Sequence, residues 1–466
     1  MNLSLPEAAE AMKALGDVDA RADVILSGVS TDSRTVKPGE LFFCLQGENF
    51  DGHSFAAKAA ASGAAAIVAE RPLEGDLGEA PVLMVQDSLA AIGALGAYWR
   101  NKIGTRVVAV TGSAGKTTIK EMLALVLSRA GLTGKNYKNF NNQLGVPLSM
   151  LTFTGQEDYW VLELGISRMG DMEELGAMVR PDLAVVVNVG IVHTEGLGDL
   201  SGVAKAKAEL LNYLSSQGMA LVSKDHSPLW ETAVSILDDP TGFSVHGNPA
   251  EYSGEYLGFD DAGRGRFRVN LAGERHEFVS GVLGRQGAEN VVATAAAAHM
   301  LGLDPELIAA GLAEFTPPEQ RFCVRSAGGF IIIDDTYNAN PLSMAASIEN
   351  AGEISNGKPL VLVLGDMLEL GGESGAEHER LGRFIARSKA RAVFYRGEHA
   401  RDVIRGIEHG EWNGDFMAVE APDDFISKFK DLEMDSAVLL FKGSRGLRME
   451  KLLSALLDAF SEERAS

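Results

Sequence analysis

The chain of 466 residues carries 64 acidic against 42 basic residues, which gives a formal net charge of −22. Such an excess of acid repels a phosphate backbone, so nucleic acid is not expected as a partner. The length exceeds what one hydrophobic core usually organises, and 46% hydrophobic with 23% charged residues is typical of a soluble globular α/β protein, so two or three domains are expected.

The first residues and the cysteines bear on location and redox state. Residues 1–20 include acids where a secretory signal needs positive charge, and no apolar run reaches the length of a membrane span. The sequence therefore predicts a cytoplasmic protein without membrane insertion. Cys44 and Cys323 are too few for a disulfide framework and lack the pair spacing of a zinc site. Two buried free thiols are expected.

Apolar runs in chain order predict three α/β domains. Short runs between Gly and Asp turns indicate a small α/β domain over residues 1–87, and a helix over residues 88–102 leads away from it. From residue 106 onward, apolar run, polar turn and amphipathic helix repeat, which is typical of a parallel sheet covered on both faces. The predicted strands are residues 107–110, 160–162, 183–187, 330–333, 360–364, 392–395 and 437–441.

A second boundary is expected near residue 316, because Pro317 and Pro318 cannot continue the preceding helix. A central parallel-sheet domain is therefore expected over residues 88–316 and a Rossmann-like α/β domain over residues 317–466. Ligands of open parallel sheets bind beyond the carboxyl ends of the strands. Polar motifs that follow the predicted strands are thus the candidates for a binding site.

The first such motif has the form of a phosphate-binding loop. After the run at 107–110 the chain reads T-G-S-A-G-K-T-T and enters an amphipathic helix. Lys116 is placed to meet terminal phosphates and Thr117 to offer a hydroxyl to Mg²⁺. The usual first glycine falls at Val110, but strand, loop and helix together favour a nucleotide site over a simple connecting turn. The predicted phosphate ligands are Gly112, Ser113, Ala114, Gly115, Lys116, Thr117 and Thr118.

Two further side chains follow the next predicted strands. Glu163 ends the run at 160–162, where a carboxylate can reach a Mg²⁺ ion held by the phosphates. His193 follows Asn188-Val189-Gly190 at the end of a buried strand. A lone Glu or His is more often structural, and only the position beside a nucleotide loop favours these two as ligands.

Taken together, seven motifs resemble the Mur ligase family over essentially the whole chain. They are T-G-S-A-G-K-T-T at 111–118, N-F-N-N-Q-L-G-V-P at 139–147, N-V-G-I-V-H at 188–193, A-K-A-K at 204–207, D-D-T-Y-N-A-N-P at 334–341, L-G-D-M-L-E-L-G at 364–371 and K-G-S-R at 442–445. Any one of them is weak evidence. All seven motifs in this order are specific to the family.

The resemblance implies ATP as a cosubstrate and Mg²⁺ as a cofactor. Family members hold two Mg²⁺ ions, and the matching positions are Thr117 and Glu163, with His193 and Lys205 at the second ion. Lys205 would act as its carbamate, because an ammonium group cannot ligate a cation. The catalytic residues implied are Lys116, Lys205, His193 and Arg321, and the further ATP contacts are Asn290, Arg321 and Asp335.

The resemblance also implies a UDP-linked substrate in the first domain. S-T-D-S-R at 30–34, followed by F-D-G-H at 50–53, matches the uridine-diphosphate pocket of members that accept UDP-muramoyl peptides. The implied substrate contacts are Ser30, Asp32, Ser33, Arg34, Asn141, Asn142, Asn338, Asn340, Lys442, Ser444 and Arg445.

Within the family, the motifs indicate a dipeptide-adding ligase. L-G-D-M-L-E-L-G is typical of members that join D-alanyl-D-alanine to UDP-N-acetylmuramoyl-tripeptide through an acyl phosphate, and the D-N-P-R motif of members that add a diamino acid does not occur. A monomeric enzyme of peptidoglycan precursor synthesis is expected. Another ligase of the superfamily, such as a folylpolyglutamate synthase, and a regulatory P-loop ATPase are the alternatives.

Overall fold

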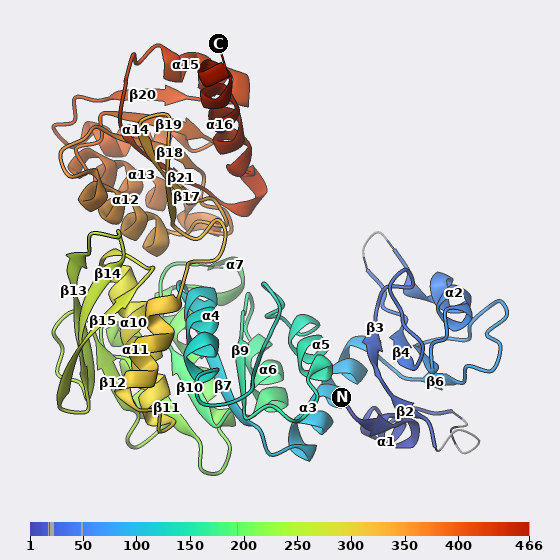
Figure 1. The fold of residues 1–466 in the computed structure, drawn as a ribbon. Helices are drawn as coiled ribbons and strands as arrows, with labels where there is room; N and C mark the ends of the chain where they lie inside the picture. The colour runs from blue at the N-terminus through green and yellow to red at the C-terminus, as the bar shows by residue number, and fades with distance from the viewer. Residues whose placement is uncertain (17, 19–22, 48–49, 193, 466) are drawn as a thin grey trace.

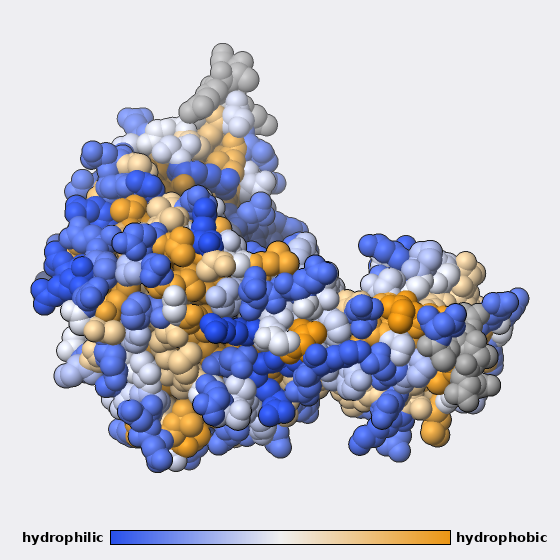
Figure 2. Space-filling view, turned by 60° about the horizontal axis from the view of Figure 1, so that its bottom comes forward, coloured by the Kyte–Doolittle hydropathy of each residue, from blue (hydrophilic) through white to orange (hydrophobic). Residues whose placement is uncertain are grey.

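The computed structural model describes residues 1–16, 18, 23–47, 50–192 and 194–465 and contains three α/β domains that follow one another along the chain. The C-terminal domain lies over one end of the central domain, and the first domain lies to the side (Figure 1). In the space-filling view the first domain is a separate lobe joined to the larger body by a narrow waist (Figure 2). The central domain therefore contacts both of the others.

A four-stranded parallel sheet in the order β3-β4-β5-β6 forms the first domain. The β1–β2 pair is antiparallel and lies outside this sheet. The elements are β1 (Leu3–Ser4), α1 (Leu5–Ala11), β2 (Ile25–Leu26), β3 (Gly28–Ser30), β4 (Glu40–Phe43), α2 (Ala56–Ala61), β5 (Ala66–Ala69) and β6 (Val82–Met84).

The central domain has a nine-stranded sheet in the order β15-β14-β13-β12-β11-β10-β7-β9-β8. Its strands are β7 (Arg106–Thr111), β8 (Thr133–Lys135), β9 (Tyr159–Glu163), β10 (Leu183–Val186), β11 (Met219–Ser223), β12 (Thr241–Ser244), β13 (Tyr252–Phe259), β14 (Gly265–Leu271) and β15 (Glu274–Ser280). Its helices are α3 (Ser88–Lys102), α4 (Lys116–Leu127), α5 (Gly145–Thr152), α6 (Asp171–Val179), α7 (Thr194–Leu197), α8 (Leu200–Ala208), α9 (Ser227–Ile236), α10 (Gly284–Met300) and α11 (Pro305–Glu314).

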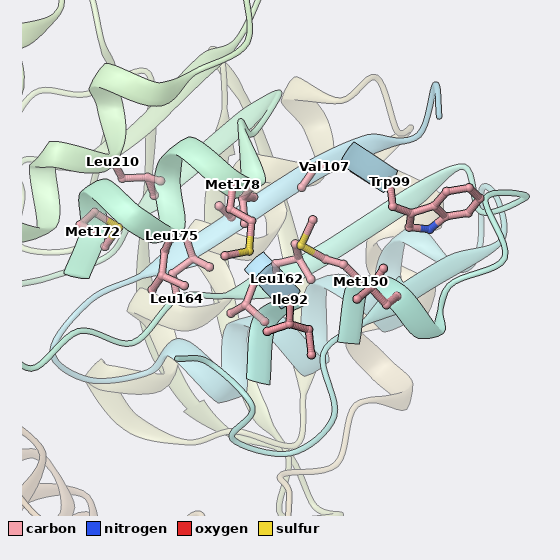
Figure 3. Close-up of a cluster of buried hydrophobic side chains, with 14 of the residues drawn as sticks. Ile92, Trp99, Val107, Met150, Leu162, Leu164, Met172, Leu175, Met178 and Leu210 are labelled. Carbon is pink, nitrogen blue, oxygen red and sulfur yellow. The ribbon is translucent and has the colours of Figure 1, made fainter. Parts of the chain in front are cut away.

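Strand β7 shows why this sheet is covered on both faces. Val107 and Ala109 belong to one buried cluster, whereas Val108 and Val110 belong to the cluster on the opposite face. Successive side chains of a strand point to opposite faces, so an uninterrupted apolar run needs apolar cover on both sides. Figure 3 shows part of the first cluster, in which side chains from α3, α5, α6 and the central strands meet: Ile92, Trp99, Val107, Met150, Leu162, Leu164, Met172, Leu175, Met178 and Leu210.

The C-terminal sheet has the order β16-β17-β21-β18-β19-β20, parallel except for the β16–β17 pair. Its strands are β16 (Cys323–Ala327), β17 (Phe330–Asp335), β18 (Leu360–Gly365), β19 (Ala392–Arg396), β20 (Asp415–Ala418) and β21 (Val438–Lys442). Its helices are α12 (Pro341–Ser355), α13 (Ser374–Arg387), α14 (Ala400–Glu408), α15 (Pro422–Lys430) and α16 (Glu450–Ala465). Apolar clusters cover both faces of the sheet.

The predicted α/β class is confirmed, and each of the seven predicted runs matches a strand to within two residues at its ends. The sheets are not wholly parallel, because β13, β14 and β15 form an antiparallel edge, and in β14 buried residues alternate with more exposed ones. Both cysteines are free, but Cys323 is only partly buried, contrary to the prediction of two buried thiols. Among the described helices, none combines the length and hydropathy that a bilayer crossing requires.

Candidate active site

The phosphate-binding loop joins the carboxyl end of β7 to the first residue of α4. Gly115 has φ +79°, and a Cβ there would lie 2.4 Å from Asn290 Oδ1, so the position requires glycine. Asn188 Oδ1 accepts hydrogen bonds from the backbone N–H groups of Ser113 and Ala114 at 3.0 and 2.9 Å. Lys116 Nζ donates to the Gly112 carbonyl at 2.8 Å. The loop therefore has a fixed shape before any ligand binds.

Glu163 is buried at the end of β9 and held by three neighbours. Its Oε2 accepts from Thr117 Oγ1 at 2.9 Å and its Oε1 from Asn141 Nδ2 at 2.8 Å. The Asn136 side-chain amide donates a hydrogen bond to the Glu163 carbonyl and accepts one from the Glu163 N–H. A hydroxyl and a carboxylate oxygen are thus brought together beside Lys116, and oxygen donors of this kind suit Mg²⁺.

Arg321 reaches the same place from the C-terminal domain. Its Nη2 donates to Thr117 Oγ1 at 3.2 Å, and its guanidinium lies 3.8 Å from the centre of the Tyr337 ring. Stacking on an aromatic face fixes the orientation of a guanidinium and leaves its edge free to bind anions. Arg321 and Lys116 therefore place two positive charges at the phosphate loop from two domains.

Asp335 and Lys442 form a buried ion pair at the carboxyl ends of β17 and β21. Lys442 Nζ lies 2.6 Å from Asp335 Oδ2, which also accepts from Ser347 Oγ at 2.6 Å. Burial lowers the pKa of Lys442, and the Asp335 carboxylate opposes that shift. Asp335 is therefore compensated by protein groups before a ribose or any other ligand arrives.

These residues line one cleft of about 470 Å³ between the central and C-terminal domains, a size suited to a small-molecule ligand. Asn290 Oδ1 is buried against Gly115, and no group within the described part of the chain donates a hydrogen bond to it. The predicted site residues that line the cleft are Ser113, Ala114, Gly115, Lys116, Thr117, Thr118, Asn141, Asn142, Glu163, Asn290, Arg321, Asp335, Asn338, Asn340 and Lys442.

Some residues predicted to contact the substrate form hydrogen bonds within the protein. Asn340 caps α12 by accepting from Ser343 N–H, and its amide donates to the Ser113 carbonyl at 3.1 Å across the two domains. Ser444 is buried, and its hydroxyl accepts from the Leu368 N–H at 2.8 Å. Arg445 is exposed and donates to Gln320 Oε1. Ser444 and Arg445 lie outside the cleft lining.

The segment at residues 30–34 lies in the first domain, away from this cleft. The exposed Arg34 forms a fork with Asp32, at 2.6 Å for the closest pair of atoms, and this holds the pKa of Asp32 at about 2. Ser30 and Ser33 are buried, and Ser30 Oγ donates to the Asp32 carbonyl at 3.2 Å. The structure thus shows a preformed polar turn with one exposed guanidinium.

Lys205, predicted as a metal ligand, has an exposed side chain on α8. Lys207 has 1% of its surface exposed, and its burial together with the nearby charge of Lys116 lowers its pKa well below the ordinary value. Residues two apart in an α-helix point about 200° apart, so one lysine faces solvent and the other faces the phosphate loop. His193, the fourth predicted ligand, lies outside the described residues.

Sequence reasoning missed the residues that hold the site in shape. Asn188, inside the quoted N-V-G-I-V-H motif, binds the phosphate loop and donates to Glu289 Oε2 at 2.7 Å. Glu289 is 101 positions away in sequence, so no local pattern could connect the pair. Lys207 could have been predicted as buried from the sequence, because Val203, Lys207 and Leu211 follow the four-residue spacing of a buried helix face.

Three family models match consecutive parts of the chain. They are "Mur ligase family, catalytic domain" over residues 25–100, "Mur ligase middle domain" over residues 110–298 and "Mur ligase, glutamate ligase domain" over residues 320–445.

Among curated proteins, the "UDP-N-acetylmuramoyl-tripeptide--D-alanyl-D-alanine ligase" of Escherichia coli (strain K12) is 36% identical over 442 residues, which cover 94% of this chain and 95% of that protein. The protein of the same name from Bacillus subtilis (strain 168) is 33% identical and covers 93% and 94% of the two chains. Among solved structures, MurF from Acinetobacter baumannii superposes with a TM-score of 0.90 at 29% identity over 98% of this chain and 99% of that one. MurF ligase from Thermotoga maritima in complex with ADP gives a TM-score of 0.83 at 26% identity over 94% and 98%.

Proposed function

The chain belongs to the Mur ligase family, and we propose that it joins D-alanyl-D-alanine to UDP-N-acetylmuramoyl-tripeptide in an ATP-dependent reaction of peptidoglycan precursor synthesis. The observation that carries this assignment is the match over more than nine tenths of the chain to ligases of that name, together with a cleft lined by residues 113–118 of the phosphate loop. Structures named as a 2,6-diaminopimelate ligase and a folylpolyglutamate synthase are 18% and 15% identical to the chain, which supports the fold alone.

Amide formation needs a leaving group better than oxide. We propose that the tripeptide carboxylate attacks the γ-phosphorus of ATP, so that ADP leaves and an acyl phosphate forms. Lys116 and Arg321, at the phosphate loop from opposite domains, neutralise charge on the transferring phosphoryl group. Because Lys116 belongs to the central domain and Arg321 to the C-terminal domain, the site is complete only when the two domains are in contact.

In the second step the dipeptide amine attacks the acyl carbon. The phosphate group leaves with the electron pair of the acyl–oxygen bond, and the amine loses a proton as the amide forms. The products are the UDP-muramoyl-pentapeptide, ADP and phosphate.

The donors present fit Mg²⁺. Thr117 and Glu163 offer adjacent oxygen atoms, and the described residues contain no group of three or more His, Cys, Asp or Glu side chains arranged to hold a metal ion, so phosphate oxygens would complete the shell. When bound, Mg²⁺ supplies positive charge to the phosphate oxygens. We assign the carbamate role to Lys207 in place of Lys205, because a buried amine of lowered basicity reacts with carbon dioxide and an exposed ammonium does not.

Location and assembly follow from the same proposal. Since the cleft is built from the central and C-terminal domains of a single chain, no partner subunit is needed to complete it, and we propose that the enzyme acts as a monomer. We place the reaction in the cytoplasm, where ATP and UDP-linked precursors are available.

The assay that tests the function measures phosphate release from ATP with UDP-N-acetylmuramoyl-tripeptide, with and without D-alanyl-D-alanine, using lysine and diaminopimelate forms of the tripeptide in parallel. We expect sustained release only with both substrates present and pentapeptide as the product. Release that is independent of the tripeptide indicates an ATPase. A preference for a free diamino acid or for glutamate indicates another ligase of the superfamily.

Replacing Arg34 with alanine tests the first-domain site. We expect the KM for the UDP-linked peptide to rise on the order of 10-fold, because an exposed guanidinium that could pair with the diphosphate is lost, while the KM for ATP stays within about twofold. The matched control is Arg264→Ala, which removes an exposed arginine forked to Asp260 in the central domain. An effect confined to ATP, or equal effects of the two variants, contradicts a diphosphate site at residues 30–34.

A further inference from the structure

Residues 367–370, called here the 367–370 loop, follow β18 at the carboxyl edge of the C-terminal sheet. Met367 and Leu370 are buried, whereas Leu368 and Glu369 between them are exposed. Glu369 lines the same cleft as Lys116 and Arg321. The loop thus keeps Met367 and Leu370 in the core and presents Glu369 to the cleft.

Hydrogen bonds from outside the loop hold it, and three of them come from distant segments of the chain. Met367 N–H donates to His378 Nε2 of α13 at 3.0 Å, and Leu368 N–H donates to Ser444 Oγ at 2.8 Å. The third bond crosses the domain boundary, because Thr194 Oγ1 of α7 donates to the Leu370 carbonyl at 2.8 Å. The shape of the loop is therefore set by groups outside it.

His378 is the buried support, and its protonation state is fixed by its partners. Its Nδ1 lies 2.7 Å from the Ser374 carbonyl, which can only accept, so Nδ1 carries the hydrogen. Its Nε2 faces an amide N–H, which can only donate, so Nε2 is unprotonated. The ring stacks on His399 at 4.3 Å between centroids, and burial lowers the pKa of His378. A neutral ring in one tautomer is what the loop requires.

We propose that the 367–370 loop recognises the incoming dipeptide through Glu369, and that His378 is the positioning residue that holds this loop in place. The inference rests on the proposed function. Lys116, Thr117 and Arg321 lie at the phosphate loop, whereas Glu369 is an acidic side chain of the same cleft that belongs to neither this loop nor the Asp335–Lys442 pair. Glu369 offers a charge opposite to that of the dipeptide ammonium group.

The test compares His378→Leu with His378→Gln by steady-state kinetics in each of the three substrates. His378→Leu leaves the Met367 N–H without its acceptor, so we expect the KM for D-alanyl-D-alanine to rise on the order of 10-fold, with the KM values for ATP and UDP-muramoyl-tripeptide within about twofold. The side-chain oxygen of glutamine can take the place of Nε2, so His378→Gln should recover most of the loss. The control is His409→Leu, which replaces an exposed histidine of the same domain.

Glu369→Ala keeps the test decisive if His378→Leu does not fold, because the substitution is at an exposed position. It should also raise the KM for the dipeptide selectively. An unchanged dipeptide KM in Glu369→Ala or in folded His378→Leu, or an equal rise for all three substrates, overturns the inference. If the parent enzyme itself does not use D-alanyl-D-alanine, the proposed function fails instead, and the two failures are distinct.

Discussion

Replacing Lys116 with alanine is expected to lower kcat on the order of 10²- to 10³-fold or more, because one preorganised positive group is lost from the transferring phosphoryl group. Lys116 is the first residue of α4, lines the cleft and donates to the loop carbonyl of Gly112. Its side chain belongs to no apolar core cluster. The thermal unfolding midpoint should therefore change little while ligation is lost, and both quantities can be measured on the same preparation.

Lys135→Ala is the matched control for this experiment. Lys135 is exposed in the same domain and pairs with Glu121, a surface contact that contributes little to stability and none to the cleft. We expect its kcat to equal that of the parent. Near-normal turnover in a folded Lys116→Ala variant would remove the basis for the phosphate-loop assignment.

The strands that could be predicted are those buried on both faces. In β18, Leu360, Leu362 and Leu364 face one cluster while Val361 and Val363 face the other, so the run is apolar without interruption. Strands β8 and β20 are short and contain glycine or charged residues, and neither was predicted. Their identity as strands depends on pairing with β9 and β19, which is information that a local pattern does not contain.

The candidate site likewise has a part that the sequence predicts and a part that it does not. The phosphate loop is local, since strand, glycines and Lys-Thr are contiguous, and the structure shows that shape. The groups that fix the loop are distant in sequence: Asn188 reaches it from the end of β10, and Glu289 orients Asn188 from α10. Such contacts result from the parallel sheet bringing several strand ends to one edge, so motifs can place the site but cannot specify its supports.

Lys205 and Lys207 belong to one motif, and the side of the helix on which each lies distinguishes them as candidate metal ligands. The A-K-A-K motif alone does not distinguish Lys205 from Lys207. The apolar residues Val203 and Leu211 lie four positions to either side of Lys207, which places that lysine on the buried side of the segment. This choice leads directly to a pair of variants with opposite expected outcomes.

Lys207→Ala is expected to lower ligase activity on the order of 10²-fold or more, whereas Lys205→Ala should remain within about twofold of the parent. The two variants remove the same atoms from one helix, so helix propensity and net charge change equally. Only Lys207 is buried close to Lys116, where a carbamate would bring an anionic oxygen to the metal and phosphate site. Bicarbonate should not restore Lys207→Ala, because no amine remains on which to form a carbamate.

A short carboxylate such as acetate, added in excess, should partly restore Lys207→Ala by supplying an oxygen ligand in place of the carbamate. The same addition should leave Lys205→Ala unchanged, which separates ligand replacement from a general salt effect. Intact-mass and peptide-mass measurements before and after acid treatment provide a readout that is independent of activity, since carbamates lose carbon dioxide in acid. Full activity of folded Lys207→Ala, or loss of activity in Lys205→Ala alone, would return the ligand role to the exposed lysine.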